Sequence, residues 1–312
     1  MGRLNELFCD YLGRTENFAD FWNGTLFRGI PLLRSKCFTR QDREYHKSQH
    51  KEEKVGVRRD VMMRYQDDGT FLLGIEVMDT LDYSIPVRIV DYDAQELMRQ
   101  VKDISSANRE AVKEGLGMWE NSGEFLYGIR KEDKLLPVHT VALYCGTDDY
   151  DGKESILKMT EYEKLPPEVK ELFVDYPVNL YQLKDLQEEN YQTSLREIIA
   201  VFKRSKNREE VKKYYLEHKK RFGQMDELSV DLMGELIGNR KLRMFKQENG
   251  GVDMCKAFED EREEGRLEGR LEGEENLRQA VSNLMKNLKM NFTQAMEVLG
   301  IPQSEWEKYG KA

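Results

Sequence analysis

Alternating apolar and polar residues within the first quarter of the chain predict a β-hairpin. The segments 58–65 and 71–77 are rich in β-branched, aromatic and long apolar residues, and Gln-Asp-Asp-Gly-Thr between them predicts a turn. If Tyr65 pairs with Phe71, the antiparallel register places Asp60 directly opposite Glu76. Side chains alternate between the two faces of the hairpin. One face is then continuously apolar and carries Val61, Met63, Tyr65, Phe71, Leu73, Ile75 and Val77. The other face carries Asp60, Met62, Arg64, Leu72, Gly74, Glu76 and Met78.

Helices and further strands are predicted on both sides of this hairpin. Apolar residues at helical spacing predict three helices, at residues 3–12, 16–28 and 86–103. Short apolar runs predict two buried strands, within residues 134–146 and 176–183. The charged segment 32–54 is predicted to be a helix or a mobile stretch, and a short first strand is expected at 54–57. This order of elements predicts an α/β fold.

The remainder of the chain is predicted to be helical. Apolar residues at helical spacing from about 184 to 248 predict a helical extension packed on the α/β core. The sequence Gln-Glu-Asn-Gly-Gly at 247–251 predicts a linker. Beyond it, an amphipathic helix is expected at 277–290, followed by a helix capped by Thr293 and a short one capped by Ser304. The predicted domains are 1–183, 184–248 and 249–312.

The segment 261–276 repeats Gly-Arg-Leu-Glu at intervals of four residues. In a helix this spacing aligns Gly265, Gly269 and Gly273 in one stripe, beside stripes of arginine, leucine and glutamate. Each glycine costs about 1 kcal/mol relative to alanine in a helix, so a stripe of three favours the close approach of another helix. We therefore expect a homo-oligomer formed through this tail. The alternative is a charged linker helix with no partner.

The composition of the chain excludes several classes of protein. The chain has 312 residues, a net charge of −9, 34% charged residues and a mean hydropathy of −0.73. No apolar run approaches the roughly 20 residues that a membrane span requires. Glu6 and Asp10 interrupt the N-terminal apolar pattern, which excludes a signal peptide. The four cysteines are far apart and predict neither a disulfide framework nor a zinc site, so we expect a cytoplasmic protein with no membrane partner.

Positive charge is concentrated locally although the net charge is negative. One basic cluster leads into the hairpin from Arg34 to Arg59, and a second extends from Lys203 to Arg221. The net charge argues against non-specific coating of nucleic acid but allows local contacts. Either cluster can follow a phosphate backbone, and the second also matches the polar face of ordinary helices.

The opposed carboxylates of Asp60 and Glu76 are the main chemical signal. Two carboxylates directly opposite each other across a strand pair lie about 5 Å apart at Cβ and repel each other. A divalent cation with oxygen ligands would relieve the repulsion. In the alternative interpretation, both side chains are solvated on an open sheet face, each near an arginine.

These stretches together resemble a known nuclease superfamily. Asp60, the hairpin and Glu76 resemble the Asp–hairpin–Glu-x-[Lys/Gln] core of the PD-(D/E)XK nucleases. Four stretches of this chain resemble one branch of the superfamily, the Rpn family of recombination-promoting, transposase-associated nucleases. They are RRDVMMRYQDDGTFLLGIEVMDTLDYSIPVRIVDYDA, KLLPVHTVALYCG, VDYPVNLYQL and EEGRLEGRLEG. The resemblance implies a restriction-endonuclease-like αβββαβ core, here followed by a helical extension and a helical C-terminal tail.

The resemblance also implies a metal site. Asp60, Glu76 and the backbone carbonyl of Val77 would hold Mg²⁺ or Mn²⁺, which polarises the scissile phosphate and activates water. The helix before the sheet in such folds often contributes an acidic residue near the metal. Asp20 or Glu16 would take that part here, and the alternative for either is a solvent-facing helix carboxylate.

This chain departs from the family pattern at one position. The family has Lys or Gln two residues after the glutamate, whereas this chain has Met78, whose thioether donates no hydrogen bond. Arg88 shares a helix face with Tyr92 and would hold the scissile phosphate or, like Arg64, replace the missing group. The alternative for Arg88 is a salt bridge with Asp91 or another nearby carboxylate.

Two functions follow from these observations. The first is a metal-dependent endonuclease that hydrolyses phosphodiester bonds in double-stranded DNA, which the presence of both Asp60 and Glu76 favours. The second is a catalytically degenerate nuclease-fold protein that acts as a DNA-binding or oligomeric interaction scaffold, which Met78 favours.

Overall fold

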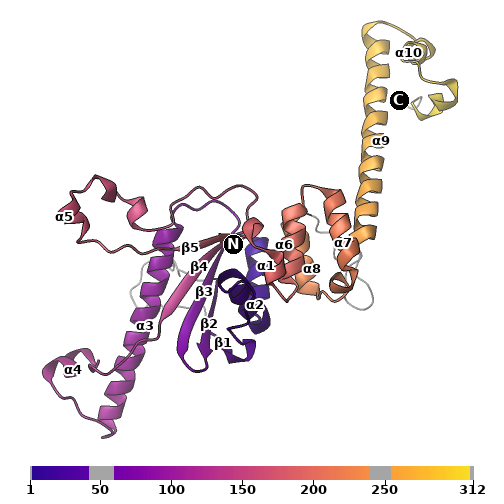
Figure 1. The fold of residues 1–312 in the computed structure, drawn as a ribbon. Coiled ribbons are helices and arrows are strands. Elements are labelled where there is room, and N and C mark those ends of the chain that lie inside the picture. Colours follow the sequence, from indigo (N-terminus) through magenta and orange to yellow (C-terminus); the bar gives the residue numbers. More distant parts are fainter. Residues whose placement is uncertain (1, 42–59, 239–253, 310–312) are drawn as a thin grey trace. The chain divides into compact units, whose positions relative to one another are not determined.

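The computed structural model describes residues 2–41, 60–238 and 254–309, and the chain forms two compact units. The first unit spans Met1–Val252 and contains the sheet, and the second spans Asp253–Ala312 (Figure 1). The predicted linker at 247–251 lies outside the described residues.

The described part of the first unit is a mixed α/β fold. Its α-helices are α1 (Arg3–Leu12), α2 (Thr15–Leu26), α3 (Ile85–Lys113), α4 (Ser122–Tyr127), α5 (Pro167–Lys170), α6 (Leu195–Arg204), α7 (Arg208–Phe222) and α8 (Glu227–Leu236). Its strands are β1 (Phe38–Arg40), β2 (Val61–Gln66), β3 (Thr70–Met78), β4 (Val138–Tyr144) and β5 (Asn179–Gln182). The helices predicted at 3–12, 16–28 and 86–103 and the strands predicted within 134–146 and 176–183 are therefore confirmed, apart from differences in extent.

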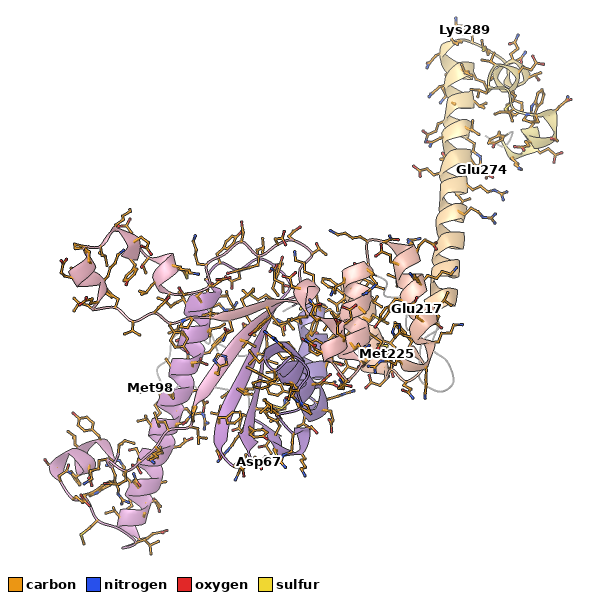
Figure 2. All side chains as sticks on the ribbon, in the orientation of Figure 1. Asp67, Met98, Glu217, Met225, Glu274 and Lys289 are labelled. Atoms are coloured by element: carbon orange, nitrogen blue, oxygen red, sulfur yellow. The ribbon has the colours of Figure 1, made fainter. Side chains whose placement is uncertain are left out.

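The strands form one five-stranded sheet in the order β1-β2-β3-β4-β5. The pairs β1–β2 and β2–β3 are antiparallel. A short turn containing Asp67 joins β2 to β3 (Figure 2). The pairs β3–β4 and β4–β5 are parallel, since α3 crosses over the sheet between β3 and β4.

The predicted register of the hairpin is confirmed. Tyr65 pairs with Phe71, and Val61 pairs with Ile75. Asp60 directly precedes Val61, so continuing the register places it opposite Glu76. Strand β2 begins three residues later than the predicted segment, whose first two residues lie outside the described residues.

Helices cover both faces of the sheet (Figure 1). On one face, Trp22 of α2 packs against His139 of β4, with ring centroids 5.9 Å apart. On the other face, Ile89 of α3 packs in an apolar cluster with Met78 of β3. The two faces of the hairpin are therefore both interior surfaces. The alternative interpretation, in which both carboxylates are solvated on an open sheet face, is wrong, because Asp60 and Glu76 are buried.

The strand that precedes the hairpin differs from the prediction. Strand β1 lies within segment 32–54, where a helix or a mobile stretch was expected, and a 3₁₀ turn at Ser35–Cys37 leads into it. Phe38 is 4% exposed and pairs with Tyr65. A strand of three residues is too short for alternation to reveal it. The strand expected at 54–57 lies outside the described residues.

The helix after the hairpin is longer than predicted. It begins at Ile85, so Pro86 is its second residue, and it continues ten residues beyond the expected end at Asp103. The additional turns contain good helix formers, and the chain leaves the helix at Gly115, which has φ +74°. Apolar periodicity weakens in these turns because none of the residues from 104 to 113 is buried.

The helical extension packs on the N-terminal helices within the first unit. Helix α8 lies against α1. Tyr11 of α1 shares a hydrogen bond with Ser194 at 2.9 Å, and Arg14 forms an ion pair with Asp226. Ser194 also shares a hydrogen bond of 2.7 Å with Ser229 of α8.

The second unit contains α9 (Met254–Asn287), α10 (Phe292–Val298) and a 3₁₀ helix at Gln303–Lys308. Two predicted caps are wrong. Asn291, rather than Thr293, caps α10, and it forms a reciprocal capping box with Gln294. Pro302 precedes the 3₁₀ helix, and Ser304 lies inside it. Within the ranges that the structure describes, no helix combines the length and apolar character that crossing a membrane would require.

Candidate active site

Asp60 and Glu76 form a buried carboxylate pair beside the end of β2. Each residue is 2% exposed. The Asp60 Oδ2 atom accepts a hydrogen bond of 2.8 Å from the backbone N–H of Val77. The bond comes from the residue directly before β2, which begins at Val61. The end of one strand thus positions a side chain against the next strand.

Arg88 and Tyr92 of α3 bind one oxygen atom of Glu76. Its Oε1 atom accepts hydrogen bonds from Tyr92 Oη at 3.1 Å and from Arg88 Nη2. Its Oε2 atom is buried and has no hydrogen-bond partner among the described residues. An unpaired buried carboxylate oxygen is costly, and such orphaned groups need a physical explanation.

Arg88 and Tyr92 come from adjacent turns of α3, as the predicted spacing of four residues requires. Arg88 Nη2 donates to Tyr92 Oη at 2.8 Å, and Arg88 Nη1 contacts Asp82 Oδ2 at 2.7 Å. The Arg88 side chain is 41% exposed, so it extends from the buried glutamate to solvent. A salt bridge was one of the two predictions for Arg88, and its partners are Glu76 and Asp82. Asp91 instead accepts a hydrogen bond from Gln95 at 2.6 Å.

The electrostatics of the pair favour the loss of one negative charge. Burial and the neighbouring Asp60 carboxylate raise the pKa of Glu76 to about 8, although Arg88 and Tyr92 act in the opposite direction. Burial also raises the pKa of Asp60, and hydrogen bonds from Val77, Asn5 and Cys9 partly offset that rise. Two buried carboxylates in this arrangement need a proton or a cation to coexist.

Helix α1 contributes two residues that the sequence analysis did not select. Asn5 Nδ2 donates to the backbone carbonyl of Val77 at 3.4 Å, and Cys9 Sγ donates to Asn5 Oδ1 at 3.2 Å. Their spacing of four residues places them on one face of the predicted helix. That spacing could not identify the face as part of the site, because only the tertiary fold brings α1 to the end of β3.

Met78 lies away from this polar site. It is 5% exposed and belongs to an apolar cluster with Ile85, Ile89, Ala142, Tyr144 and Val178. Its position two residues after Glu76 puts it on the same sheet face, but the first turns of α3 cover it with isoleucines. Met78, the residue at the family's Lys or Gln position, therefore has its side chain in the apolar core.

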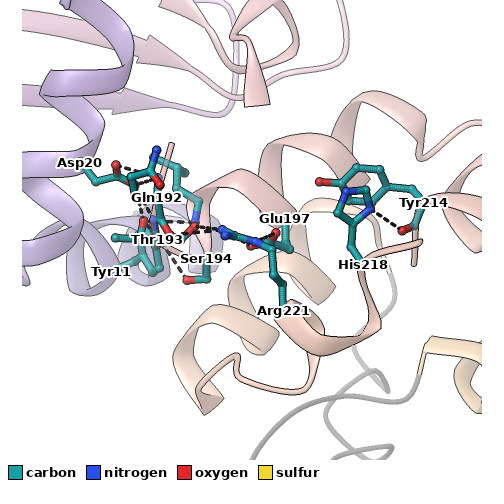
Figure 3. Close-up of polar contacts among 10 residues, drawn as sticks. Tyr11, Asp20, Gln192, Thr193, Ser194, Glu197, Tyr214, His218 and Arg221 are labelled. Atoms are coloured by element: carbon teal, nitrogen blue, oxygen red, sulfur yellow. Dashed lines mark hydrogen bonds and ion pairs between the residues drawn. The ribbon is translucent and has the colours of Figure 1, made fainter. Parts of the chain in front are cut away.

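Asp20 has a different structural role from the one predicted. Its carboxylate accepts hydrogen bonds from the backbone N–H groups of Gln192 and Thr193 at 2.8–3.0 Å, and from Thr193 Oγ1 at 2.6 Å (Figure 3). These bonds join α2 to the segment that leads into α6. Both oxygens are thus occupied, and the contacts support a structural clamp rather than a metal ligand. Glu16 is exposed on the first turn of α2.

Arg64 is less well placed than Arg88 to replace a missing catalytic group. It pairs with Leu72, four residues along β2 from Asp60, which corresponds to about 13 Å along the strand. Arg88 contacts Glu76 directly. Of the two arginines considered from the sequence, the geometry therefore favours Arg88.

Ion pairs account for part of both basic clusters. In the first cluster Arg34 pairs with Asp67, and residues 42–59 lie outside the described residues. In the second cluster Lys203 and Arg204 both contact Glu188. These contacts fit the interpretation of the second cluster as the polar face of ordinary helices.

The donor set of the site fits a hard divalent cation. Two carboxylates and a peptide carbonyl are oxygen ligands of the kind that Mg²⁺ and Mn²⁺ prefer, and Glu76 Oε2 is free to accept a contact. Within the described ranges, no group of three or more His, Cys, Asp or Glu side chains could hold a metal. A cation here would therefore depend on Asp60, Glu76 and neutral oxygen atoms.

Comparison of the chain with protein-family models, with curated proteins and with solved structures found no match in any of the three.

Replacing Glu76 with glutamine should reduce the dependence of stability on pH. The pKa of Glu76 is about 8 in the folded protein, above its usual value of 4.5, so the folded state holds this proton more tightly than the unfolded chain. The resulting stabilisation is complete below about pH 4.5 and is lost as the pH rises through about 8. In thermal unfolding scans, the melting temperature of the wild type should fall relative to that of Glu76→Gln between about pH 5 and pH 9. Glu110→Gln, at a mostly exposed position of α3, is the control, and parallel profiles for wild type and Glu76→Gln would contradict the expectation.

Substitutions at Met78 should change the free energy of unfolding as expected for a residue in the apolar core. Met78→Leu conserves volume and should cost less than about 1.5 kcal/mol of unfolding free energy. Met78→Gln buries an unpaired amide in an apolar cluster and should cost about 1–3 kcal/mol. The control is Met98→Gln on the exposed side of α3, where methionine is 56% exposed and the change should be nearly neutral. Urea unfolding measures all three, and a Met78→Gln variant as stable as wild type would mean that the amide reaches polar partners.

Proposed function

We propose that this protein is a metal-dependent endonuclease of the PD-(D/E)XK type, related to the recombination-promoting Rpn nucleases, that hydrolyses phosphodiester bonds in double-stranded DNA. The observation that carries the proposal is the buried pair Asp60–Glu76 with its unpaired Glu76 Oε2 atom. A pair with no ligand would be expected to relax toward solvent or toward neutral residues, because opposed buried carboxylates destabilise the fold. The order of a helix, three antiparallel strands, a crossover helix and a parallel strand supports the αβββαβ core.

Each residue of the site would have a distinct part in this reaction. Asp60, Glu76 and the Val77 carbonyl would hold Mg²⁺ or Mn²⁺, which when bound polarises the phosphate and lowers the pKa of an attacking water. Arg88 would bind a non-bridging phosphate oxygen, since its guanidinium is partly exposed and carries several donors. Tyr92 would orient Glu76 through its hydrogen bond of 3.1 Å.

A second candidate function has its own supporting observation. Met78 packs in the apolar core at the position where the family has Lys or Gln, and Arg88 already neutralises Glu76. Both facts favour a nuclease-fold protein that has lost turnover and serves as a DNA-binding or oligomeric scaffold. The two candidates differ in whether the carboxylate pair is needed for chemistry.

Cleavage of supercoiled plasmid DNA separates these two functions. With Mg²⁺ or Mn²⁺, the wild type should nick the plasmid, and Asp60→Asn should be slower by about 100-fold or more, because a bound metal supplies several kcal/mol of transition-state stabilisation. Arg88→Ala should also slow cleavage. The matched control is Arg99→Ala, which removes an arginine of the same helix, of equal 41% exposure and likewise paired with a buried glutamate, Glu96.

Two outcomes would decide against the enzyme. If every variant including wild type is inert while DNA still binds, the scaffold function replaces the nuclease. If Asp60→Asn cleaves as fast as wild type, the activity belongs to another site or to a contaminant.

The proposed partner of the tail is a second copy of the chain. Gly269 and Gly273 lie on α9 where an added Cβ would meet nothing within 4 Å, so the surface is open to the close approach of another helix. This open surface supports a homo-oligomer in which two copies of α9 contact each other along the glycine stripe.

Full-length variants can test this contact by light scattering. The double substitution of Gly269 and Gly273 by glutamine should lower the measured mass, because the longer side chains prevent close approach. Substitution of both by alanine is the control, since alanine remains small and raises helix propensity. An unchanged mass in the glutamine variant would exclude the stripe as an oligomer contact.

A further inference from the structure

The amide of Asn5 lies against the oxygen atoms that the proposed function assigns to a cation. Its Nδ2 atom donates to the Val77 carbonyl at 3.4 Å, and the same side chain also hydrogen-bonds to the Asp60 carboxylate. Asn5 therefore directs its amide hydrogens at two of the three proposed ligands. In this state, the partial positive charge of an NH₂ group stands where a cation would be attracted.

The other end of the Asn5 amide is held by a weak partner. Cys9 Sγ donates to Asn5 Oδ1 at 3.2 Å, and a thiol is only a weak hydrogen-bond donor. Because sulfur is also a weak acceptor, Cys9 can face either end of the amide. The oxygen and nitrogen ends of an amide are nearly identical in size, so a half turn about its last bond exchanges them without repacking. The local contacts therefore allow both orientations.

We propose that Asn5 is a third side-chain ligand of a divalent cation bound by Asp60 and Glu76, and that its amide turns over when the cation binds. The inference rests on the proposed function. With the cation present, Asn5 Oδ1 faces the metal beside the Val77 carbonyl, and the NH₂ group faces Cys9. Amide carbonyl oxygens are established ligands of hard cations, and a neutral ligand adds no repulsion to an already negative site. The same side chain thus serves as a donor in the cation-free state and as an acceptor in the bound state.

The placement of Asn5 on α1 makes this coupling specific. Helix α1 packs against both β3 and α8, so the amide is carried by a fixed element rather than a loop. Phe8, Tyr11 and Leu12 of the same helix are each 0% exposed, which fixes its position on the core. A ligand on a rigid element loses little entropy when the cation binds.

The test is Mn²⁺ binding to the full-length protein, measured by the electron paramagnetic resonance signal of free Mn²⁺. We expect Asn5→Leu, which keeps the side-chain volume and removes the oxygen, to weaken Mn²⁺ binding by about tenfold or more, the range that site-supporting groups typically contribute. Asn5→Asp should restore or tighten binding, because it supplies an oxygen with a full charge. Asn17→Leu is the matched control: Asn17 is a buried asparagine of α2 that donates to the Tyr11 carbonyl at 2.9 Å, and Mn²⁺ affinity should not change.

The outcomes separate this inference from the proposed function. If Asp60→Asn abolishes Mn²⁺ binding while Asn5→Leu binds like wild type, Asn5 is not a ligand, and the two-carboxylate site stands. If Cys9→Ala loses binding while Asn5→Leu does not, the thiolate is the third ligand and the inference is overturned. If the wild type binds no Mn²⁺ at millimolar concentration, both the inference and the metal-dependent function fail. Circular dichroism checks that Asn5→Leu and Asn5→Asp are folded. If Asn5→Leu is unfolded, the Mn²⁺ affinity of Asn5→Asp still tests the inference.

Discussion

The repulsion between two buried carboxylates is the constraint around which the N-terminal unit is built. Asp60 and Glu76 face each other at the end of β2, and each is 2% exposed. Neighbouring groups compensate part of this cost. The Val77 amide binds Asp60, and Arg88 with Tyr92 binds one oxygen of Glu76. The remaining buried oxygen has no partner among the described residues, so the compensation is incomplete in a way that suits a cation.

The same constraint explains why α3 carries different kinds of residue on successive turns. Its first turns place Ile85 and Ile89 over Met78, and Arg88 and Tyr92 over Glu76. One helix therefore seals an apolar cluster and neutralises an adjacent charge. Because Met78 is enclosed in that cluster, the polar side chains that contact Glu76 come from α3 instead of β3. Arg88 is the side chain in contact with Glu76 that also reaches solvent.

The N-terminal helices α1 and α2 add contacts to Asp60 and to the helical extension. Asn5 and Cys9 approach Asp60 from α1, and Asp20 of α2 binds the chain at Gln192 and Thr193. The helical extension is consequently tied to α2 and, through Tyr11 and Ser194, to α1, which contacts the site. Asp20 and Asn5 differ in their contacts. The Asp20 carboxylate accepts hydrogen bonds from Gln192 and Thr193, whereas the Asn5 amide contacts the Val77 carbonyl through a long bond and Cys9 through a weak one.

The sequence by itself determined the hairpin, its register and the opposition of Asp60 and Glu76. These depend on a period of two and a short turn, which are local properties of the chain. Strand β1 escaped detection because three residues contain too little alternation. The burial of both carboxylates, the contact of Arg88 with Glu76, the core position of Met78 and the approach of Asn5 were decided only by the tertiary structure. Each of these depends on where a helix distant in sequence comes to rest on the sheet, and local periodicity carries no information about that placement.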